Sequence, residues 1–267
     1  MIWQCRDKAI EYGTRVLVMG IVNVTPDSFS DGGCYVTAEA AVAHALTLLQ
    51  DGADIIDLGA QSTRPGYQEI TPEEEWQRLQ PVITALRQQT AAPLSVDTYF
   101  PSVAANALAA GADIINDVSG TVSLEMAQVV QQYGAGWVIM HSGAGGIETV
   151  KAFFPQAAAA ATAFGVRKEQ LCFDMGIGFG KSVEENLALL ANVEKYKYSG
   201  YPLLLGVSRK RVIGAAGGEQ TPFKRLPGNV AADSAAICGG VDMIRIHDVK
   251  NEIQGIRTAE ALKAARC

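Results

Sequence analysis

Charged residues are scarce in this 267-residue chain, and their scarcity excludes whole classes of protein. They make up 19% of the residues, whereas apolar residues make up 48%. A disordered chain has the opposite balance, so we expect a packed core. The net charge of −6 is also opposite in sign to that of a general nucleic-acid binder. We therefore expect no nucleic-acid partner.

Cysteine, histidine and long apolar runs are also in short supply. The five cysteines are scattered without a C-x-x-C pair and only three histidines accompany them, so no zinc-site spacing is present. The longest apolar stretches, residues 16–22 and 157–161, fall far short of the roughly 20 residues that span a bilayer. No basic start precedes an apolar segment at the N-terminus. We expect reduced thiols, a cytoplasmic location and no membrane partner.

What the chain does contain is a regular alternation of strand-like and helix-like segments. Amphipathic spacing between the strand-like runs, as at Trp76, Leu79, Val82, Ile83 and Leu86, predicts helices. One unit takes about 33 residues, the size of a βα repeat. Nearly continuous apolar strands predict a parallel sheet that is buried on both faces. The predicted strands are residues 16–22, 55–58, 94–96, 114–115, 137–140, 171–173, 203–207 and 243–246.

An internal repeat favours a closed barrel. Residues 52–57 (GADIID) and 111–116 (GADIIN) agree at five of six positions, and residues 240–245 are a looser third copy. Each copy joins a glycine turn, an apolar strand and a polar residue at the strand's end. This pattern favours an α/β fold with a single (β/α)₈ TIM barrel over an open doubly wound sheet. We predict one domain over residues 1–267, with residues 1–12 as an N-terminal flap, a hairpin that closes the barrel floor.

Helix start signals support this alternation. Thr71 precedes Pro72 and lies three residues before Glu74, and Ser182 lies three residues before Glu185. Both patterns predict a helix N-terminus with a capping box.

Polar side chains follow the predicted strands, at the end of a barrel where active sites lie. Strand ends meet water, which accounts for some of these residues without any function. It accounts less well for Asp97, Asn116 and Asp174, which directly follow apolar strands. Convergent hydrogen-bonding groups over an apolar floor suit a flat heterocycle. The polar residues at strand ends are Asn23, Asp57, Asp97, Asn116, Asp117, His141, Asp174, Ser208, Arg209, Lys210, Arg245 and His247.

A basic run and a glycine-rich loop follow two of the later strands. Residues 208–211 (SRKR) lie where a helix is expected to begin, and cations there oppose the helix dipole. With Arg64, Arg245 and His247 they predict an anionic substrate, the alternative being a solvated charge run. Residues 175–182 (MGIGFGKS) nearly match a phosphate loop, but Met175 occupies a required glycine position. We interpret this segment as a flexible glycine loop rather than a nucleotide cradle.

The loop after the first strand, which contains Pro26, Phe29 and a Gly32–Gly33 pair, is long and irregular, and such βα loops usually carry function. With seven further segments it resembles the dihydropteroate synthase family of the pterin-binding barrel superfamily. The eight segments fall in order over nearly the whole chain, and the first two are long and specific. They are residues 19–33, 57–66, 95–98, 115–120, 140–141, 174–181, 206–210 and 245–249.

The resemblance implies the joining of 6-hydroxymethyl-7,8-dihydropterin diphosphate to 4-aminobenzoate, with help from Mg²⁺, in a homodimer. Asp174, Asn116 and Lys210 are then expected at the pterin edge and Asp97 beside the ring. Arg245 is expected to cover the pterin and, with His247, to hold the diphosphate. The residues expected to carry the chemistry are Asp97, Lys210, Arg245 and His247, with Asn23 as the Mg²⁺ ligand. The remaining substrate contacts implied are Phe29, Asp31, Ser62, Thr63, Arg64, Pro65, Phe179 and Ser208.

Two departures from the family pattern leave alternatives open. Methionine occupies position 175, where the family has proline. Because proline fixes φ, the methionine is expected to loosen the turn. Residues 142–146 (SGAGG) replace a longer family segment, which leaves one pocket wall open to question. One alternative is a pterin-binding methyltransferase that passes a methyl group to a corrinoid. The loops expected to hold diphosphate count against it, because methyl transfer involves no diphosphate. The other is a catalytically silent paralogue that binds pterin.

Overall fold

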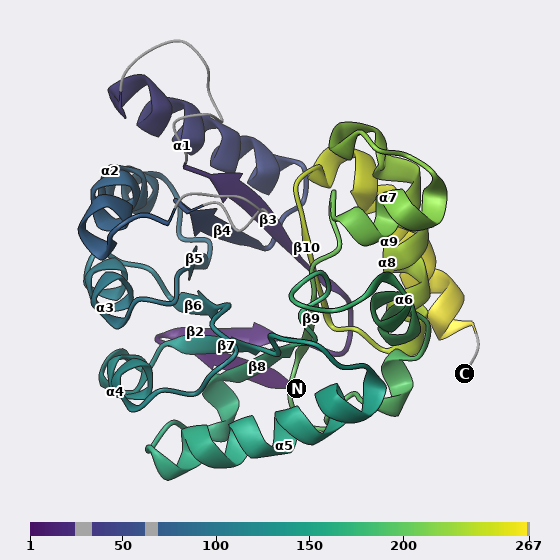
Figure 1. Ribbon diagram of the computed structural model, residues 1–267. Coiled ribbons are helices and arrows are strands. Elements are labelled where there is room, and N and C mark those ends of the chain that lie inside the picture. Colours follow the sequence, from purple (N-terminus) through teal and green to yellow (C-terminus); the bar gives the residue numbers. More distant parts are fainter. Residues whose placement is uncertain (25–33, 62–68, 266–267) are drawn as a thin grey trace.

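Eight parallel strands close into a barrel at the centre of the computed structural model, which describes residues 1–24, 34–61 and 69–265 (Figure 1). The barrel order is β10-β3-β4-β5-β6-β7-β8-β9, so β10 pairs with both β9 and β3. The predicted (β/α)₈ barrel is confirmed. Its strands are β3 (Leu17–Asn23), β4 (Ile55–Gly59), β5 (Leu94–Asp97), β6 (Ile114–Asp117), β7 (Gly136–Met140), β8 (Leu171–Asp174), β9 (Leu203–Leu205) and β10 (Met243–Ile246).

Helices surround the barrel and cover its outer face (Figure 1). Among the described residues, none of these helices is both long and apolar enough to cross a membrane. They are α1 (Cys34–Gln50), α2 (Pro72–Gln89), α3 (Pro101–Ala109), α4 (Leu124–Tyr133), α5 (Ile147–Ala163), α6 (Val183–Ala191), α7 (Arg211–Gly217), α8 (Leu226–Gly239) and α9 (Val249–Ala264), with short 3₁₀ turns at Lys168–Gln170, Val193–Lys195 and Pro222–Lys224.

Alternation along each strand divides the core into two parts. Ile56 and Leu58 of β4 belong to the large cluster between strands and helices. Ile55, one position earlier, belongs to a smaller cluster with residues of the other strands and of the N-terminal hairpin. Successive side chains of a strand point to opposite faces. A residue two positions after a member of the smaller cluster on the same strand therefore also faces the barrel interior. Asp57 is therefore the next inward residue above Ile55.

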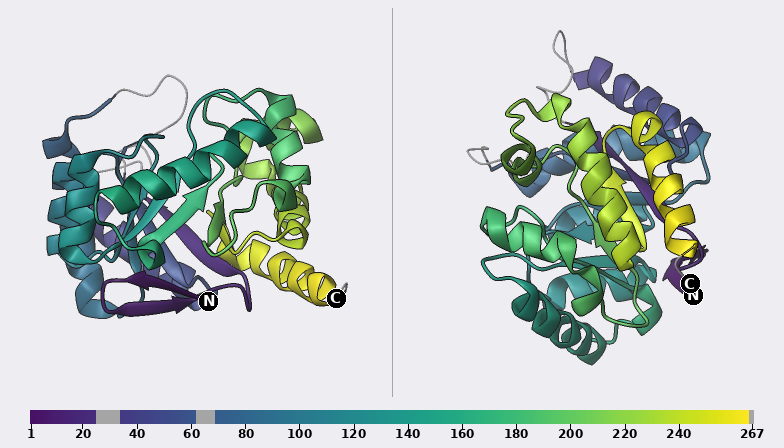
Figure 2. Two further views of the ribbon diagram at one scale, coloured as in Figure 1. Left: turned by 90° about the horizontal axis from the view of Figure 1, so that it is seen from below. Right: turned by 90° about the vertical axis from the view of Figure 1, so that its right-hand side faces the viewer.

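The N-terminal residues form the predicted hairpin. Strands β1 (Ile2–Cys5) and β2 (Lys8–Glu11) pair in antiparallel fashion and lie across one end of the barrel (Figure 2). Trp3 and Cys5 are fully buried in the inner cluster, and the Trp3 indole N–H donates to the Gln170 carbonyl at 2.9 Å. The hairpin thereby closes the floor of the barrel, as the sequence predicts.

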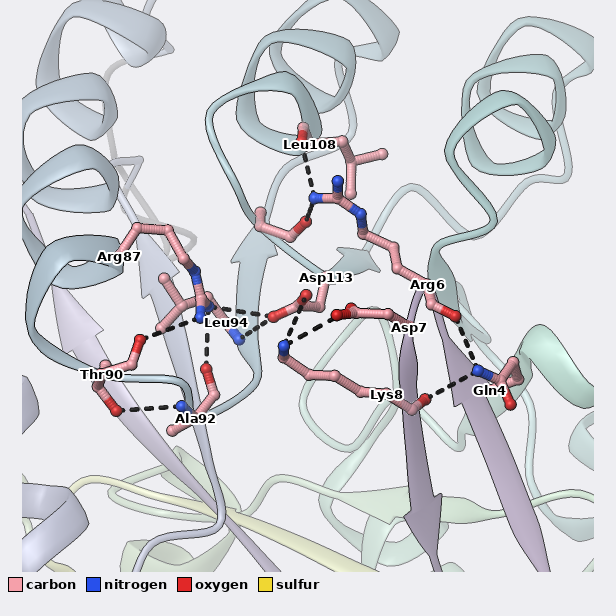
Figure 3. Close-up of polar contacts among 11 residues, drawn as sticks. Gln4, Arg6, Asp7, Lys8, Arg87, Thr90, Ala92, Leu94, Leu108 and Asp113 are labelled. Carbon is pink, nitrogen blue, oxygen red and sulfur yellow. Dashed lines mark hydrogen bonds and ion pairs between the residues drawn. The ribbon is translucent and has the colours of Figure 1, made fainter.

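Polar contacts tie this hairpin to the barrel (Figure 3). The Arg6 guanidinium donates to the carbonyls of Leu108 and Ala112 at 3.0 and 2.8 Å. Asp113 is 3% exposed and meets Arg87 at 3.1 Å and Lys8 at 3.6 Å. The floor is thus sealed by apolar burial inside and by paired charges at its edge.

One predicted capping box forms in full and the other in half. Ser182 accepts from the Glu185 N–H at 3.1 Å, and Glu185 accepts from the Ser182 N–H at 2.8 Å. Thr71 accepts from the Glu74 N–H at 3.2 Å, but the Glu74 carboxylate pairs with Arg78 at 2.5 Å. The prediction of a complete box at Thr71 is therefore wrong, because a charged partner one turn along the helix takes the carboxylate.

Candidate active site

Polar side chains gather inside the barrel at the carboxyl ends of its strands, opposite the hairpin. Strand register places Asn23 beside Gly59, Gly59 beside Asp97, and Asp97 beside Asn116. These residues of four adjacent strands form one row. Gly59 has no side chain, so the row stays open between Asn23 and Asp97. The strand-end positions singled out in the sequence therefore converge.

Arg245 of β10 crosses the barrel to two carboxylates on other strands. Its Nε donates to Asp57 Oδ2 at 2.7 Å and its Nη2 donates to Asp97 Oδ2 at 2.8 Å. Asn116 Nδ2 donates to the same Asp57 oxygen at 3.3 Å. Burial raises the pKa of Asp97 to about 7, although Arg245 opposes the rise. Asp57 is a site residue to which the sequence analysis gave no role, although its place at a strand end was a signal.

Asp174 and Lys210 face one another from β8 and the start of α7. Burial raises the pKa of Asp174, and the nearby Lys210 charge works against this rise. Burial likewise lowers the pKa of Lys210 to about 8, with Asp174 opposing. The Lys210 ammonium donates to the Ile177 carbonyl at 2.6 Å and lies 4.7 Å from the centre of the Phe179 ring. The site therefore brings together Asp174, Lys210 and Phe179, as expected.

The basic run after β9 divides between the site and the surface. A helix does begin there, since Lys210 is the N-cap residue of α7. Lys210 faces the site, whereas Arg211 is exposed. The alternative of a solvated charge run thus describes Arg211 but not Lys210.

The glycine-rich loop after β8 is held by many contacts, so the expectation of a flexible loop is wrong. Lys181 Nζ donates to the carbonyls of Gly176, His141 and Phe179 at 2.9, 3.2 and 3.4 Å. A side chain on Gly176 would collide with the His141 carbonyl, and the φ of 68° lies in the left-handed region that favours glycine. Lys181 is a second residue that sequence reasoning missed, and its position just after the glycines was the available signal.

The two departures from the family pattern are both accommodated by packing. Met175 is fully buried and its sulfur lies 2.9 Å from the Tyr196 hydroxyl, so packing holds the methionine in place. That it loosens the turn relative to proline stays a prediction. The short segment after His141 packs on the glycine loop, where Gly143 N donates to the Phe179 carbonyl at 3.2 Å. The short segment thus contacts the Phe179 backbone at the pocket wall that the sequence left open to question.

Ser208 and His247 come together at the ends of β9 and β10. The Ser208 hydroxyl lies 3.0 Å from His247 Nδ1 and accepts from the His247 backbone N–H at 3.3 Å. Ser208 is buried and His247 is half-buried. His247 is two residues beyond Arg245 at the end of β10, and Ser208 follows the neighbouring strand β9. This pair completes the described part of the expected site.

Six expected contacts lie outside the described residues. They belong to the segments that follow β3 and β4, and their predicted roles stay predictions. These residues are Phe29, Asp31, Ser62, Thr63, Arg64 and Pro65.

Asn23 is the predicted Mg²⁺ ligand, and its surroundings are compatible with one particular kind of metal site. In the described part of the chain, no group of three or more His, Cys, Asp or Glu residues could hold a metal ion. Mg²⁺ keeps several waters and is commonly bound by one or two protein oxygens together with substrate phosphates. The half-buried Asn23 amide at the strand end suits that arrangement.

Two surface hollows lie away from these groups. One of about 340 Å³ lies beside the hairpin near Tyr12 and Lys168, and one of about 260 Å³ lies between α2 and α3 near Trp76. Neither includes the interior carboxylates, and the chemistry therefore favours the barrel interior.

Known proteins match both the sequence and the fold. Residues 19–247 match the profile of the family described as Pterin binding enzyme. A dihydropteroate synthase of Synechocystis sp. is 42% identical over 94% of this chain and 92% of its own length. The solved Clostridium difficile dihydropteroate synthase, obtained in the presence of pteroic acid, is 43% identical with a TM-score of 0.90 over 95% of this chain and 98% of its own. The Xanthomonas albilineans dihydropteroate synthase, solved with 4-aminobenzoic acid, is 41% identical with a TM-score of 0.91 over 99% of both chains.

The chain therefore belongs to the pterin-binding enzyme family, a class of barrel proteins. Within that class its relatives are dihydropteroate synthases, which are transferases, and it belongs with them. The resemblance stated from the sequence is confirmed, and the corrinoid methyltransferase alternative is set aside.

Proposed function

We propose that this chain condenses 6-hydroxymethyl-7,8-dihydropterin diphosphate with 4-aminobenzoate. A C–N bond forms between the pterin methylene and the arylamine, the C–O bond to diphosphate breaks, and the amine proton passes to solvent. The products are 7,8-dihydropteroate and diphosphate. The observation that carries the proposal is the meeting of Asp97, Asp174, Lys210 and Arg245 above an apolar floor.

The pterin ring takes its place at the buried carboxylate. Asp174 accepts N–H groups from the ring edge, Asn116 offers both a donor and an acceptor, and Lys210 donates. Asp174 is 7% exposed and Asn116 is 2% exposed, so these bonds form away from competing water. Binding in this direction leaves the methylene on the outer side of the ring.

Departure of diphosphate leaves positive charge spread over the pterin. The site stabilises both the pterin cation and the departing diphosphate. Asp97 lies beside the ring and stabilises the cation. Arg245 covers one face of the pterin and, with His247, holds the diphosphate. The arylamine is neutral at pH 7, so the attack requires no strong general base.

Mg²⁺, when bound, supplies further positive charge to the diphosphate oxygens. Asn23 would hold the ion together with substrate oxygens and water. Support comes from the hard oxygen of Asn23 at the strand end, level with Gly59 and near Asp97.

The aminobenzoate lies outside the pterin, toward the rim. Phe179 lines it from the glycine loop, and Ser208 lies near its carboxylate. The segments after β3 and β4 supply the other contacts. These are Phe29, Asp31 and Pro65 around the ring, and Ser62, Thr63 and Arg64 toward the diphosphate and the aminobenzoate.

The working form of the enzyme is a cytoplasmic homodimer. Support beyond the family resemblance comes from exposed apolar side chains on the outside of the barrel. Val183 and Leu187 of α6 are 37% and 39% exposed, and Phe223, in the 3₁₀ turn before α8, is 70% exposed. Light scattering at micromolar concentration should give twice the 28.3 kDa chain mass.

The direct test is turnover. The purified protein is incubated with both substrates and Mg²⁺, and diphosphate and dihydropteroate are measured together. We expect diphosphate release to require both 4-aminobenzoate and Mg²⁺. Tight pterin binding without release would identify the silent paralogue instead.

A further inference from the structure

Asp57 is the common partner of two groups that face the substrate. Its Oδ2 accepts from Arg245 Nε at 2.7 Å and from Asn116 Nδ2 at 3.3 Å. These donors come from β10 and β6, on either side of β4, so one carboxylate oxygen of β4 holds side chains from two other strands. Asp57 is 0% exposed, so no solvent competes for these bonds.

The two carboxylates that hold Arg245 differ in their access to a ligand. The Asp97 side chain is 15% exposed, whereas the Asp57 side chain is 0% exposed. Asp97 is therefore accessible to a substrate that enters the barrel, and Asp57 is not. When Asp97 is engaged with the pterin, Asp57 is the remaining carboxylate partner of Arg245 among the residues that the structure describes.

Resting on the proposed function, we propose that Asp57 is a positioning residue that holds Arg245, and secondarily Asn116, for the reaction. An arginine side chain has several rotatable bonds, and its guanidinium acts on the diphosphate only from one place. The contact at Nε holds the guanidinium near its base and does not itself occupy the terminal nitrogens, of which Nη2 donates to Asp97 at 2.8 Å.

A packing role alone does not explain the geometry. The second Asp57 oxygen, Oδ1, is buried without a hydrogen-bond partner among the described residues. A buried carboxylate with an unpaired oxygen is costly, and an apolar residue would fill the same space without that cost. The negative charge of Asp57 instead serves to hold Arg245 through the Nε contact.

The experiment is a double-mutant cycle read by steady-state kinetics for the pterin substrate. Asp57→Asn keeps the shape but removes the charge, and we expect kcat/KM to fall about 10- to 100-fold. In an Arg245→Lys background, where Nε is absent, the same substitution should cost less than about threefold. Equal losses in the two backgrounds would overturn the proposal, as would full activity of Asp57→Asn.

Asp113→Asn is the matched control. Asp113 is also buried and also paired with an arginine, Arg87 at 3.1 Å, but it lies at the floor of the barrel. We expect it to lower stability while kcat/KM of the folded enzyme stays within about threefold of the parent. An activity loss as large as that of Asp57→Asn would show that any buried ion pair has this effect, and the proposal would fail.

A second variant and a binding measurement keep the experiment decisive if Asp57→Asn does not fold or the parent shows no turnover. Should Asp57→Asn not fold, Arg245→Lys alone still tests the idea, because its ammonium cannot reproduce the Nε contact. We expect a loss of about 10- to 100-fold, and full activity would overturn the proposal. Absence of turnover in the parent would instead refute the proposed function. Calorimetry with 6-hydroxymethyl-7,8-dihydropterin then still reports whether Asp57→Asn weakens binding through Asn116.

Discussion

The floor and the rim of the barrel interior are built by the same strands, two residues apart, yet they have opposite chemistry. Ile55, Ile114, Cys172 and Met243 lie in the inner apolar cluster with the hairpin. Two positions later on the same four strands are polar or charged residues, Asp57, Asn116, Asp174 and Arg245.

The difference shows how the fold separates stability from chemistry. At the floor, charged pairs such as Asp113 with Arg87 lie at the edge, and the interior is apolar. At the rim, the charges Asp57, Asp97 and Arg245 are inside. Burial shifts pKa values in both places, raising that of Asp113 at the floor and that of Asp97 at the rim. Only at the rim do the shifted groups face the interior where substrate is expected.

The largest expected effect comes from breaking the floor. Trp3→Ala removes a fully buried indole and its bond to the Gln170 carbonyl, so the free energy of unfolding should fall by about 3–5 kcal/mol. Urea denaturation measures this change. Below the unfolding transition, kcat/KM should stay within about threefold of the parent. A large activity loss in the folded variant would mean that floor and rim are coupled.

The corresponding substitution at the rim should affect binding first. Asp174→Asn presents an amide donor to the pterin N–H groups, and pterin affinity should fall about 10- to 100-fold. The substitution also weakens the contact from the Gly176 N–H, which Asp174 Oδ1 now accepts at 2.7 Å. Calorimetry with 6-hydroxymethyl-7,8-dihydropterin gives the affinity, and parent-like binding would place the pterin elsewhere.

The rim should also give the enzyme a narrow pH optimum. The pKa of Asp97 is raised to about 7 by burial, and that of Lys210 is lowered to about 8 by burial. Activity needs the first deprotonated and the second protonated. The pH profile of kcat/KM for the pterin should therefore rise through about 7 and fall above about 8, roughly tenfold per pH unit on either side.

Lys210→Arg separates the two limbs of that profile. A guanidinium stays protonated far above pH 8, so the falling limb should disappear while the rising limb remains. Retention of the falling limb would assign it to another group, such as Lys181, whose pKa is also lowered to about 8 by burial.

The smallest expected effect concerns two buried acidic side chains outside the barrel interior. Asp233 of α8 and Glu252 of α9 are each 1% exposed. Burial raises the pKa of Glu252 to about 7, and burial with the neighbouring Glu252 raises that of Asp233. The folded chain thus keeps protons that the unfolded chain releases, so the free energy of unfolding should fall as pH rises from about 5 to about 7.

Asp233→Asn removes one of these two acids. The dependence of stability on pH should become shallower, with a gain of about 1–2 kcal/mol at pH 8. Urea denaturation at several pH values measures it, with the exposed Glu73→Gln as the control. An unchanged slope would show that the pair does not govern this range.

Sequence patterns predicted the fold well because they are local. All eight predicted strands are present, and only the seventh ends early, at Leu205 rather than at residue 207. Apolar runs, glycine turns and caps such as Ser182 with Glu185 act over a few residues, so they can be read without neighbours. The ends of these apolar runs also placed Asp97, Asn116, Asp174 and Arg245 together at the carboxyl end of the barrel.

Contacts across the barrel were decided only by the tertiary structure. Arg245 meets Asp57 and Asp97, which lie 188 and 148 positions earlier in the chain. The glycine loop is held by Lys181 and by Gly143 of the segment after His141, although its composition indicated flexibility. Such pairings depend on how the strands close and register, and on burial that changes the energy of every charge. The sequence by itself determined which residues face the interior, and closure of the barrel decided which of them meet.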